Sequence, residues 1–180
     1  MGTMLVDVER LVVADAVVTH TVVPTPLGPT TLVAHDGRLS ALLMPSSKYS
    51  EVQGPFGQRD DEGFDEVRTQ LEEYFSGART TFDLPLALLG TDFQVRVWEG
   101  LLKIPYGQTW SYGELAESVG LDPRTSSRAV GAANGRNRIA IVVPCHRVIG
   151  ANGTLTGFAA GLDRKRFLLD LEQGTPELLF

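Results

Sequence analysis

Hydrophobic residues alternate with polar ones over short runs in the first half of the chain, the pattern of half-buried β-strands. The sequence Asp36-Gly37 between two of these runs is a strong signal for a tight hairpin. We therefore expect a three-stranded antiparallel meander, to which residues 4–13 could add an edge strand. The three runs cover residues 17–23, 30–34 and 38–44.

The pattern then changes from alternation to helical spacing. Residues 46–61 are rich in Ser, Gly, Gln and Pro, a composition that predicts a loop. A helix should follow it and end at Gly77, and residues 82–86 should then be extended. The helical face is formed by Phe64, Val67, Leu71, Tyr74 and Phe75.

The second half of the chain is predominantly helical in pattern. Thr91 or Asp92 should cap a first helix, which Pro105 and Gly107 stop. Its apolar face is formed by Phe93, Val97 and Leu101.

Three more helices should follow. Ser111 with Glu114 forms a capping box and predicts a helix that reaches Gly120. Thr125 or Ser126 then opens a helix over residues 128–134. Two short helices joined by a tight turn that contains glycine are the layout of a helix-turn-helix. Asp163 should cap the last helix, which ends at Gly174.

These elements predict an α+β fold with two domains. Residues 1–90 form the N-terminal domain, with a small antiparallel sheet and helices, and residues 91–180 form a mainly α C-terminal domain with a helix-turn-helix. A chain of 180 residues with 43% hydrophobic content can bury a core of this size.

The stretch of residues 139–150 contains the only cysteine of the chain. Its apolar, β-branched first half predicts a strand, and Pro144 removes a backbone donor. Cys145 should therefore lie at a strand end or in a tight turn. Considered alone, a single cysteine is more often a buried apolar residue than a reactive one.

Charge is distributed unevenly along this acidic chain, whose net charge is -6. Residues 1–90 contain 6 Lys and Arg against 13 Asp and Glu, whereas residues 91–180 contain 10 against 9. A local cluster of arginines suits a confined phosphate contact, although a solvated positive face is the alternative. The cluster consists of Arg124, Arg128, Arg136, Arg138 and Arg147, with Asp122 as the only acid between residues 120 and 150.

Several classes of protein are disfavoured by the composition. One cysteine cannot form an internal disulfide, and the three histidines do not fall at metal-ligand spacing, so we expect no metal and no cofactor. The first ten residues carry acids where a signal peptide needs basic residues. No run approaches the roughly 20 apolar residues of a membrane helix. We expect a cytoplasmic protein without a membrane partner.

Four motifs in a fixed order resemble the O6-alkylguanine-DNA alkyltransferases, which move alkyl groups from guanine onto their own cysteine. They are Ser-Tyr-Gly at 111–113, Arg-Ala-Val-Gly at 128–131, Asn137, and Pro-Cys-His-Arg-Val at 144–148. The resemblance runs from about Thr91 to Glu172, and before Thr91 it covers only the general layout. It implies a ribonuclease-H-like N-terminal domain and a C-terminal domain that binds DNA.

The resemblance also implies a relay at the cysteine. Free cysteine has a pKa of about 8.5, so Cys145 needs a base to become a thiolate. Adjacent side chains point apart, so a water should connect Cys145 to His146, while Glu172 orients the imidazole. The thioether that forms cannot be cleaved by these groups, so each molecule should react once.

Other roles follow from the matching positions. Tyr112 resembles the tyrosine that rotates a phosphate and donates to the guanine oxygen, and Asn137 resembles the hinge that holds the turn before the active site. Arg128 resembles the finger that fills the gap left by a flipped base. Further DNA-binding positions implied are Ser126, Ser127, Ala129, Gly131 and Ala132. Pocket positions implied are Val148, Gly157, Phe158, Ala159 and Ala160.

The pocket departs from the family at two positions. Relatives commonly have Gly-Tyr-X-Gly-Gly where this chain has Gly157-Phe158-Ala159-Ala160-Gly161. A phenolic hydroxyl is therefore absent and a methyl group has been added. We expect methyl lesions to be accepted and bulky groups to be disfavoured.

The function that the sequence favours is single-turnover repair of O6-alkylguanine, chiefly O6-methylguanine, in double-stranded DNA. No obligate protein partner is expected, and cooperative binding along DNA is left open. One alternative is a non-enzymatic module that binds alkylated DNA and flags lesions, but relatives of that kind lack the cysteine that stands at Cys145. A cysteine hydrolase is a further alternative, disfavoured because it needs direct contact between Cys145 and His146.

Overall fold

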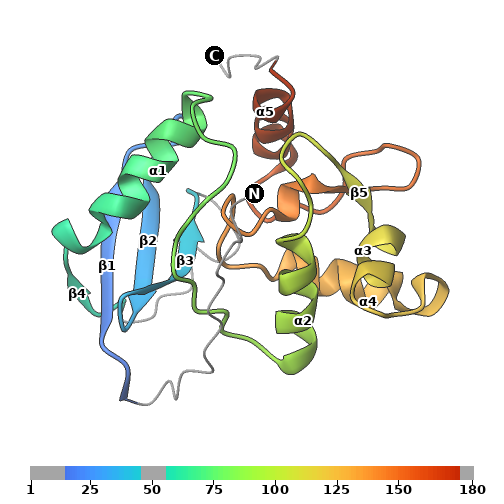
Figure 1. Ribbon diagram of the computed structural model, residues 1–180, viewed down its shortest axis with the longest axis horizontal. Coiled ribbons are helices and arrows are strands. Elements are labelled where there is room, and N and C mark those ends of the chain that lie inside the picture. The colour runs from blue at the N-terminus through green and yellow to red at the C-terminus, as the bar shows by residue number, and fades with distance from the viewer. Residues whose placement is uncertain (1–14, 46–55, 175–180) are drawn as a thin grey trace. The chain divides into compact units, whose positions relative to one another are not determined.

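The computed structural model describes residues 15–45 and 56–174 (Figure 1). The chain divides into two compact units, Met1–Leu89 and Gly90–Phe180. The expected strand at residues 4–13 lies outside the described residues. Within the described segments, no helix is long and apolar enough to cross a membrane.

The sheet of the first unit contains the predicted antiparallel meander. β1 (Val18–Val23) pairs antiparallel with β2 (Thr30–His35), and β2 pairs antiparallel with β3 (Arg38–Leu43). A fourth strand, β4 (Gln58–Arg59), pairs parallel with β1 in a segment that was expected to be a loop. The sheet is therefore mixed, with the order β3-β2-β1-β4. Two exposed polar residues carry no alternation, so their sequence gives no signal for a strand.

One helix covers a face of this sheet (Figure 1). It is α1 (Asp65–Phe75), preceded by the 3-10 turn η2 (Glu62–Phe64), and it confirms the predicted helix. The side chain of Gln70 donates to the carbonyl of Asp83 and accepts from its amide, both at 2.9 Å. These two hydrogen bonds fix the chain that follows α1. The buried apolar residues of α1 are Val67, Leu71 and Tyr74.

The segment expected to be extended at residues 82–86 runs beside β3. Leu39 donates to the carbonyl of Pro85, and its own carbonyl accepts from Ala87, both at 2.9 Å. The pairing amounts to an isolated parallel bridge between Leu39 and Leu86. A single bridge satisfies the backbone here without forming a regular strand.

The second unit contains the first three of the four helices expected from Thr91 onward. They are α2 (Asp92–Leu101), α3 (Tyr112–Ser118) and α4 (Pro123–Gly135). Capping boxes are present at Thr91 with Gln94 and at Ser111 with Glu114. Each such cap is worth about 1 kcal/mol to its helix.

The helix α4 begins earlier than the sequence predicted. Its cap is Asp122, whose Oδ1 accepts from the amide of Arg124 at 2.8 Å, and not Thr125 or Ser126. Pro123 occupies the first turn, where its fixed φ suits a helix and its missing N–H costs nothing. The Asp122-Pro123 pair is therefore the start of the helix.

The strand predicted before the cysteine is absent. Residues 140–143 are a series of turns in which Ile141 has a φ of 70°. Val143 donates to the carbonyl of Ile139 at 2.9 Å and Val142 to that of Ala140 at 2.8 Å, so the backbone is satisfied locally. The prediction of a strand at residues 139–143 was wrong. An apolar run indicates that a segment is buried, but it does not indicate that the segment pairs within a sheet.

A short parallel pair and a last helix complete the second unit. β5 (Trp110–Ser111) pairs with β6 (Val148–Ile149), and neither strand was predicted. The helix α5 (Leu162–Glu172) starts after Gly161, so Asp163 lies in its first turn and is not its cap.

Candidate active site

Cys145 opens the 3-10 turn η3 (Cys145–Arg147), directly before β6. Its side chain is buried, with 6% of the residue exposed. Burial raises the pKa of the thiol, while hydrogen bonding by Asn137 and the charge of Lys165 oppose that rise. The neutral thiol is therefore the resting form, and a proton acceptor is required to generate the nucleophile.

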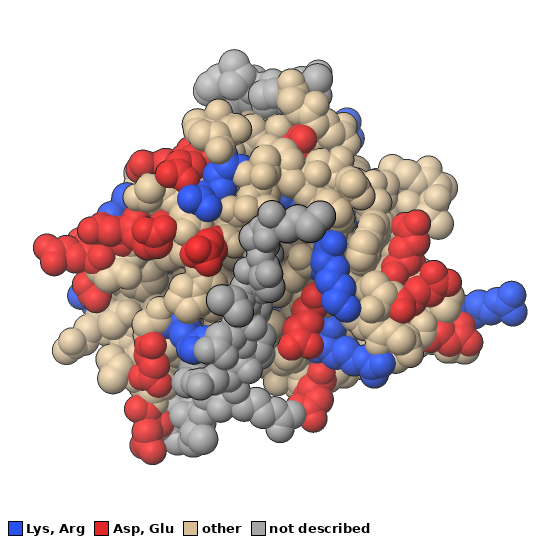
Figure 2. Space-filling model, viewed as in Figure 1, with Lys and Arg blue, Asp and Glu red and all other residues tan. Residues whose placement is uncertain are grey.

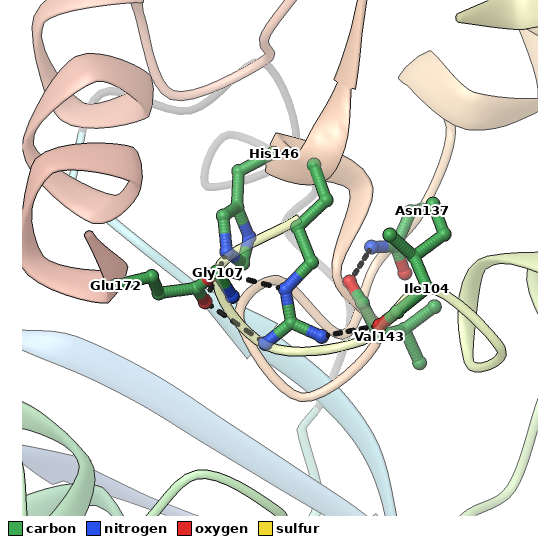
Figure 3. A network of polar contacts seen from close by, with 7 residues as sticks. Ile104, Gly107, Asn137, Val143, His146 and Glu172 are labelled. Atoms are coloured by element: carbon green, nitrogen blue, oxygen red, sulfur yellow. Dashed lines mark hydrogen bonds and ion pairs between the residues drawn. The ribbon is translucent and has the colours of Figure 1, made fainter. Parts of the chain in front are cut away.

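Asn137 closes the turn that leads to the cysteine (Figure 3). Its Nδ2 donates to the carbonyl of Val143 at 2.7 Å, and its Oδ1 accepts from the amide of Ile139 at 3.0 Å. The residue is 6% exposed, so these bonds are shielded from water. One amide side chain thus takes the place of the strand pairing that the sequence had predicted.

His146 and Glu172 form a buried pair between η3 and α5 (Figure 3). The distance from His146 Nε2 to Glu172 Oε1 is 2.7 Å, and both side chains are at most 1% exposed. Burial lowers the pKa of His146, although Glu172 opposes that effect. Nδ1 of His146 is buried and has no hydrogen-bond partner among the described residues.

Glu172 remains ionised in this environment. Burial by itself would raise the pKa of its carboxyl, but hydrogen bonds and charge from His146 and Arg147 outweigh it and hold that pKa well below the usual range. A carboxylate can only accept hydrogen bonds, so Nε2 of His146 must donate. The unpartnered Nδ1 of a neutral His146 then carries the lone pair.

Arg147 does not lie on the surface, where the charge pattern had placed it. Its side chain is 9% exposed, and its guanidinium donates to both oxygens of Glu172, each at 2.9 Å. A third bond, of 2.7 Å, goes from Nη1 to the carbonyl of Ile104 (Figure 3). The interpretation of Arg147 as a phosphate contact was therefore wrong, because all these donors face inward.

Lys165 is a site residue that the sequence analysis missed. It is fully buried, and its Nζ donates to the carbonyls of Val148 at 2.5 Å and Thr156 at 2.8 Å. Burial lowers its pKa to about 8, against the attraction of Cys145. Helical spacing could have found it, because Lys165, Leu168 and Glu172 lie on one face of α5. The basic run Arg164-Lys165-Arg166 hid that signal, since such runs are usually solvated.

Tyr112 begins α3 and reaches the loop before α5. Its hydroxyl lies 3.2 Å from Oγ1 of Thr156 and donates weakly to the Thr156 carbonyl at 3.4 Å. A Cβ at Gly131 would lie 3.6 Å from two ring carbons of Tyr112, and one at Gly157 would lie 3.6 Å from its hydroxyl. The structure therefore brings Tyr112 beside α4 and beside the expected pocket loop. Thr156 was not predicted from the sequence.

The expected pocket residues surround the same region at different depths. Val148 is fully buried, and Ala160 is 7% exposed. Phe158 and Ala159 are half-buried, so both are accessible in part to a ligand. Gly157 has a φ of 54°, a conformation that L side chains rarely adopt.

The helix α4 presents small residues and arginines to solvent. Its buried side is formed by Val130, Ala133 and Asn134. Ser127 is half-buried and its hydroxyl donates to the carbonyl of Pro123, so that hydroxyl is already engaged. Ser126 and Gly131 are also half-buried. The exposed residues are Arg124, Thr125, Arg128, Ala129 and Ala132.

The remaining charged groups do not suggest a metal site. In the described parts of the chain, no three His, Cys, Asp or Glu side chains come together as metal ligands would. Acidic side chains gather over α1 in the first unit (Figure 2), where Asp65, Glu66 and Glu72 are exposed. A surface of that sign is unfavourable for contact with phosphates.

Two protein-family models match the chain. Residues 92–174 match the model described as "6-O-methylguanine DNA methyltransferase, DNA binding domain". Residues 18–88 match the model described as "6-O-methylguanine DNA methyltransferase, ribonuclease-like domain". The second match extends the likeness over the half of the chain where motifs had indicated only a layout.

Known proteins are similar to the chain over most of its length. The methylated-DNA–protein-cysteine methyltransferase of Mycobacterium bovis is 50% identical over 151 residues, which cover 84% of this chain and 90% of the relative. That of Methanosarcina acetivorans is 49% identical over 154 residues, covering 85% and 97%. The crystal structure of Mycobacterium tuberculosis OGT in complex with DNA has a TM-score of 0.80 and 47% identity, covering 88% and 94%.

Proposed function

The chain belongs to the O6-methylguanine DNA methyltransferase family, and on that premise we propose that Cys145 accepts the alkyl group of O6-alkylguanine in DNA. Repair of O6-methylguanine by transfer to a protein cysteine is the activity of this family, and it is the activity of this chain. One observation supports the choice of acceptor: the sequence contains a single cysteine, so no other thiol is available.

The chemistry requires a soft nucleophile and a route for its proton. The Cys145 sulfur gives its proton to a water, and the water passes a proton to Nδ1 of His146. The sulfur–carbon bond then forms as the bond from carbon to guanine O6 breaks, and the electron pair of that bond stays on the base. Tyr112 donates a hydrogen bond to the departing oxygen. The base finally takes up one proton from water, and the imidazolium of His146 returns one proton to water, so the protons balance.

The proton route depends on groups that lie apart from the sulfur. The neutral His146 has its proton on Nε2, directed at Glu172, so its Nδ1 is free to accept. Glu172 stabilises the imidazolium while it exists, as the acid of a catalytic triad does. No group among these can break a thioether, so each protein molecule reacts once.

The substrate must leave the duplex to reach a buried thiol. The exposed side of α4 lies against DNA, where the small residues Ala129 and Ala132 permit a close approach and Arg128 fills the gap left by the base. Val148 and residues 157–160 then enclose the flipped guanine.

Intact-mass analysis tests the proposal. The protein is incubated with a duplex oligonucleotide that contains one O6-methylguanine, and its mass should rise by one methylene equivalent, located on the peptide with Cys145. Cys145→Ser is the matched control: it should gain no mass yet bind the same duplex within a few-fold of the unmodified protein. A protein that binds methylated duplex but gains no mass would instead be a lesion-binding module. A gain on another residue would refute Cys145 as the acceptor.

A further inference from the structure

We propose that Arg147 is a positioning residue that holds Glu172 as a doubly bound carboxylate, so that His146 keeps Nδ1 free as the proton acceptor. This inference rests on the proposed function, because it assigns Arg147 a part in the same proton route. The sequence had suggested a phosphate contact for this arginine instead.

Arg147 and Glu172 form an ion pair with two hydrogen bonds. Nε of Arg147 donates to Oε2 of Glu172 and Nη2 donates to Oε1, both at 2.9 Å. A planar guanidinium that meets both oxygens fixes the carboxylate in distance and in rotation, which a point charge cannot do. The side chains are 9% and 1% exposed, so water competes little for these bonds.

The chain between α2 and β5 anchors this ion pair. Nη1 of Arg147 donates to the carbonyl of Ile104 at 2.7 Å, and the amide of Gly107 donates to Oε2 of Glu172 at 3.3 Å (Figure 3). The Tyr106 ring lies 5.7 Å from the guanidinium carbon. One short segment therefore holds both members of the pair.

The tautomer of His146 follows from the ionised state of Glu172. Oε1 of Glu172 accepts from Arg147 and also lies 2.7 Å from Nε2 of His146. Because His146 and Arg147 together keep the carboxylate ionised, that oxygen accepts and Nε2 donates. Nδ1 then has no proton in the neutral ring, and it is the buried nitrogen that has no hydrogen-bond partner among the described residues.

Arg147 also affects the charge state of His146. The charged groups that act on His146 are Glu172 and Lys165 from α5, with Arg147 from η3. Glu172 favours the imidazolium, whereas burial and the two cations favour the neutral ring. Without Arg147 the full carboxylate charge would act on His146, and the imidazole would be protonated to a higher pH. A protonated ring cannot accept the proton of Cys145.

A purely structural role for Arg147, tying η3 to α5, would lower activity by the same factor at every pH. The proposal predicts a different result. The second-order rate of methyl transfer is measured from pH 5 to 9 for the unmodified protein, Arg147→Met and Arg147→Lys. In Arg147→Met the acid limb of the profile should move up by about one pH unit, and the rate should partly recover at high pH. Arg147→Lys, which keeps the charge, should show a smaller shift.

Two further variants separate the effect from general damage. Arg166→Met removes an exposed arginine of α5 and should leave the limb in place. In a Glu172→Gln background, Arg147→Met should cause a clearly smaller shift, because only the direct effect of the guanidinium charge on His146 remains. A uniform loss at all pH values, or an equal shift with and without Glu172, would overturn the proposal.

A measurement on the unmodified protein covers the case in which Arg147 variants do not fold. Nitrogen-15 NMR of labelled histidine, assigned with His20→Gln and His35→Gln, should show a neutral His146 ring with its proton on Nε2 at pH 7. An imidazolium, or a proton on Nδ1, would refute this role of Arg147. If the unmodified protein gains no methyl group, the proposed function fails by itself, while the NMR result still decides the state of His146.

Discussion

The ammonium group of Lys165 donates a hydrogen bond of 2.5 Å to the main-chain carbonyl of Val148, three residues after the cysteine. A second bond, of 2.8 Å, reaches the carbonyl of Thr156. Lys165 thus joins the strand that follows Cys145 to the loop that carries the expected pocket. Its charge also opposes the effect of burial on the thiol.

Lys165→Met should slow methyl transfer about tenfold at pH 7, which corresponds to a rise of about one unit in the pKa of Cys145. Since the pKa of Lys165 is lowered to about 8, the ammonium is present below that pH and absent well above it. The difference between the variant and the unmodified protein should therefore narrow above pH 9. Second-order rates measured from pH 6.5 to 9.5 check this.

The matched control is Lys103→Met, which removes an exposed lysine from the same unit. It should change the rate by less than about twofold, as surface substitutions usually do little. A constant ratio across the pH range in Lys165→Met would show that the side chain serves packing and not charge.

Glu172→Gln should cost about 3–5 kcal/mol of unfolding free energy at pH 7, because it leaves the guanidinium of Arg147 buried without its counterion. The pKa of Glu172 is depressed in the folded protein, so the stability it contributes is fully present above pH about 4.5 and is lost as the pH falls toward the folded pKa. The difference between the two proteins should therefore shrink in acid. Urea denaturation from pH 3.5 to 7 measures it.

A difference that stayed constant down to pH 3.5 would contradict the assignment of the ionised pair. Glu114→Gln is a useful comparison, because that carboxylate accepts from the amide of Ser111 at an exposed helix start. Its effect should be about 1 kcal/mol or less.

The helices were predictable because their signals are local. Ser111 and Glu114 stand three residues apart in the sequence and form the capping box that the spacing implies. The N-cap of α4 was misplaced because Asp122-Pro123 has two local interpretations, a turn or a helix start. The residues after Pro123 have to distinguish a turn from a helix start. Several of these residues are equally compatible with a helix that begins at either point.

The environment of the cysteine was harder to predict. An apolar run such as residues 139–143 can be buried either as a strand or as a compact turn. Here the side chain of Asn137 favours the turn, because it bonds to the backbone of Ile139 and Val143. The bonds of Arg147 and Lys165 join groups that are 9 to 43 residues apart. Such partners follow from packing, which spacing along one chain does not encode. The family resemblance supplied roles for Cys145 and His146, and the structure added the cations around them.

Arg128→Ala should weaken binding to duplex DNA by about 1–3 kcal/mol and slow repair there to a similar extent. Arg128 is exposed on α4, beside the small residues Ala129 and Ala132. A gap-filling side chain matters only where a base has left a duplex, so the loss should be smaller with free O6-methylguanine. Titration with a labelled duplex and rates on both substrates check the prediction.

Arg166→Ala removes the same charge from α5 and should affect duplex binding less. Equal losses of rate on the duplex and on the free base would show that Arg128 supports the pocket or the fold. In that case another residue on the exposed side of α4 would have to fill the gap.

Ala160→Gly should restore reaction with O6-benzylguanine while changing methyl transfer little. Ala160 is 7% exposed, so its methyl group is enclosed where relatives commonly have a glycine. Overfilling a packed site costs about 1–3 kcal/mol, or roughly ten- to a hundredfold in rate, and a benzyl group needs more room than a methyl group. Phe158 offers an aromatic face on which the base can stack, so we expect methyl transfer to be independent of the missing hydroxyl.

The comparison needs both substrates and a neighbouring methyl group as control. Ala159→Gly removes a half-buried methyl one residue earlier, at a position where the family pattern tolerates different residues, and it should not favour the benzyl substrate. Second-order rates of the three proteins with methylated oligonucleotide and with O6-benzylguanine decide the matter. Fast benzyl transfer by the unmodified protein would reject the steric argument, because the methyl group of Ala160 would then not limit the pocket. An equal gain in both glycine variants would assign the effect to loop flexibility instead.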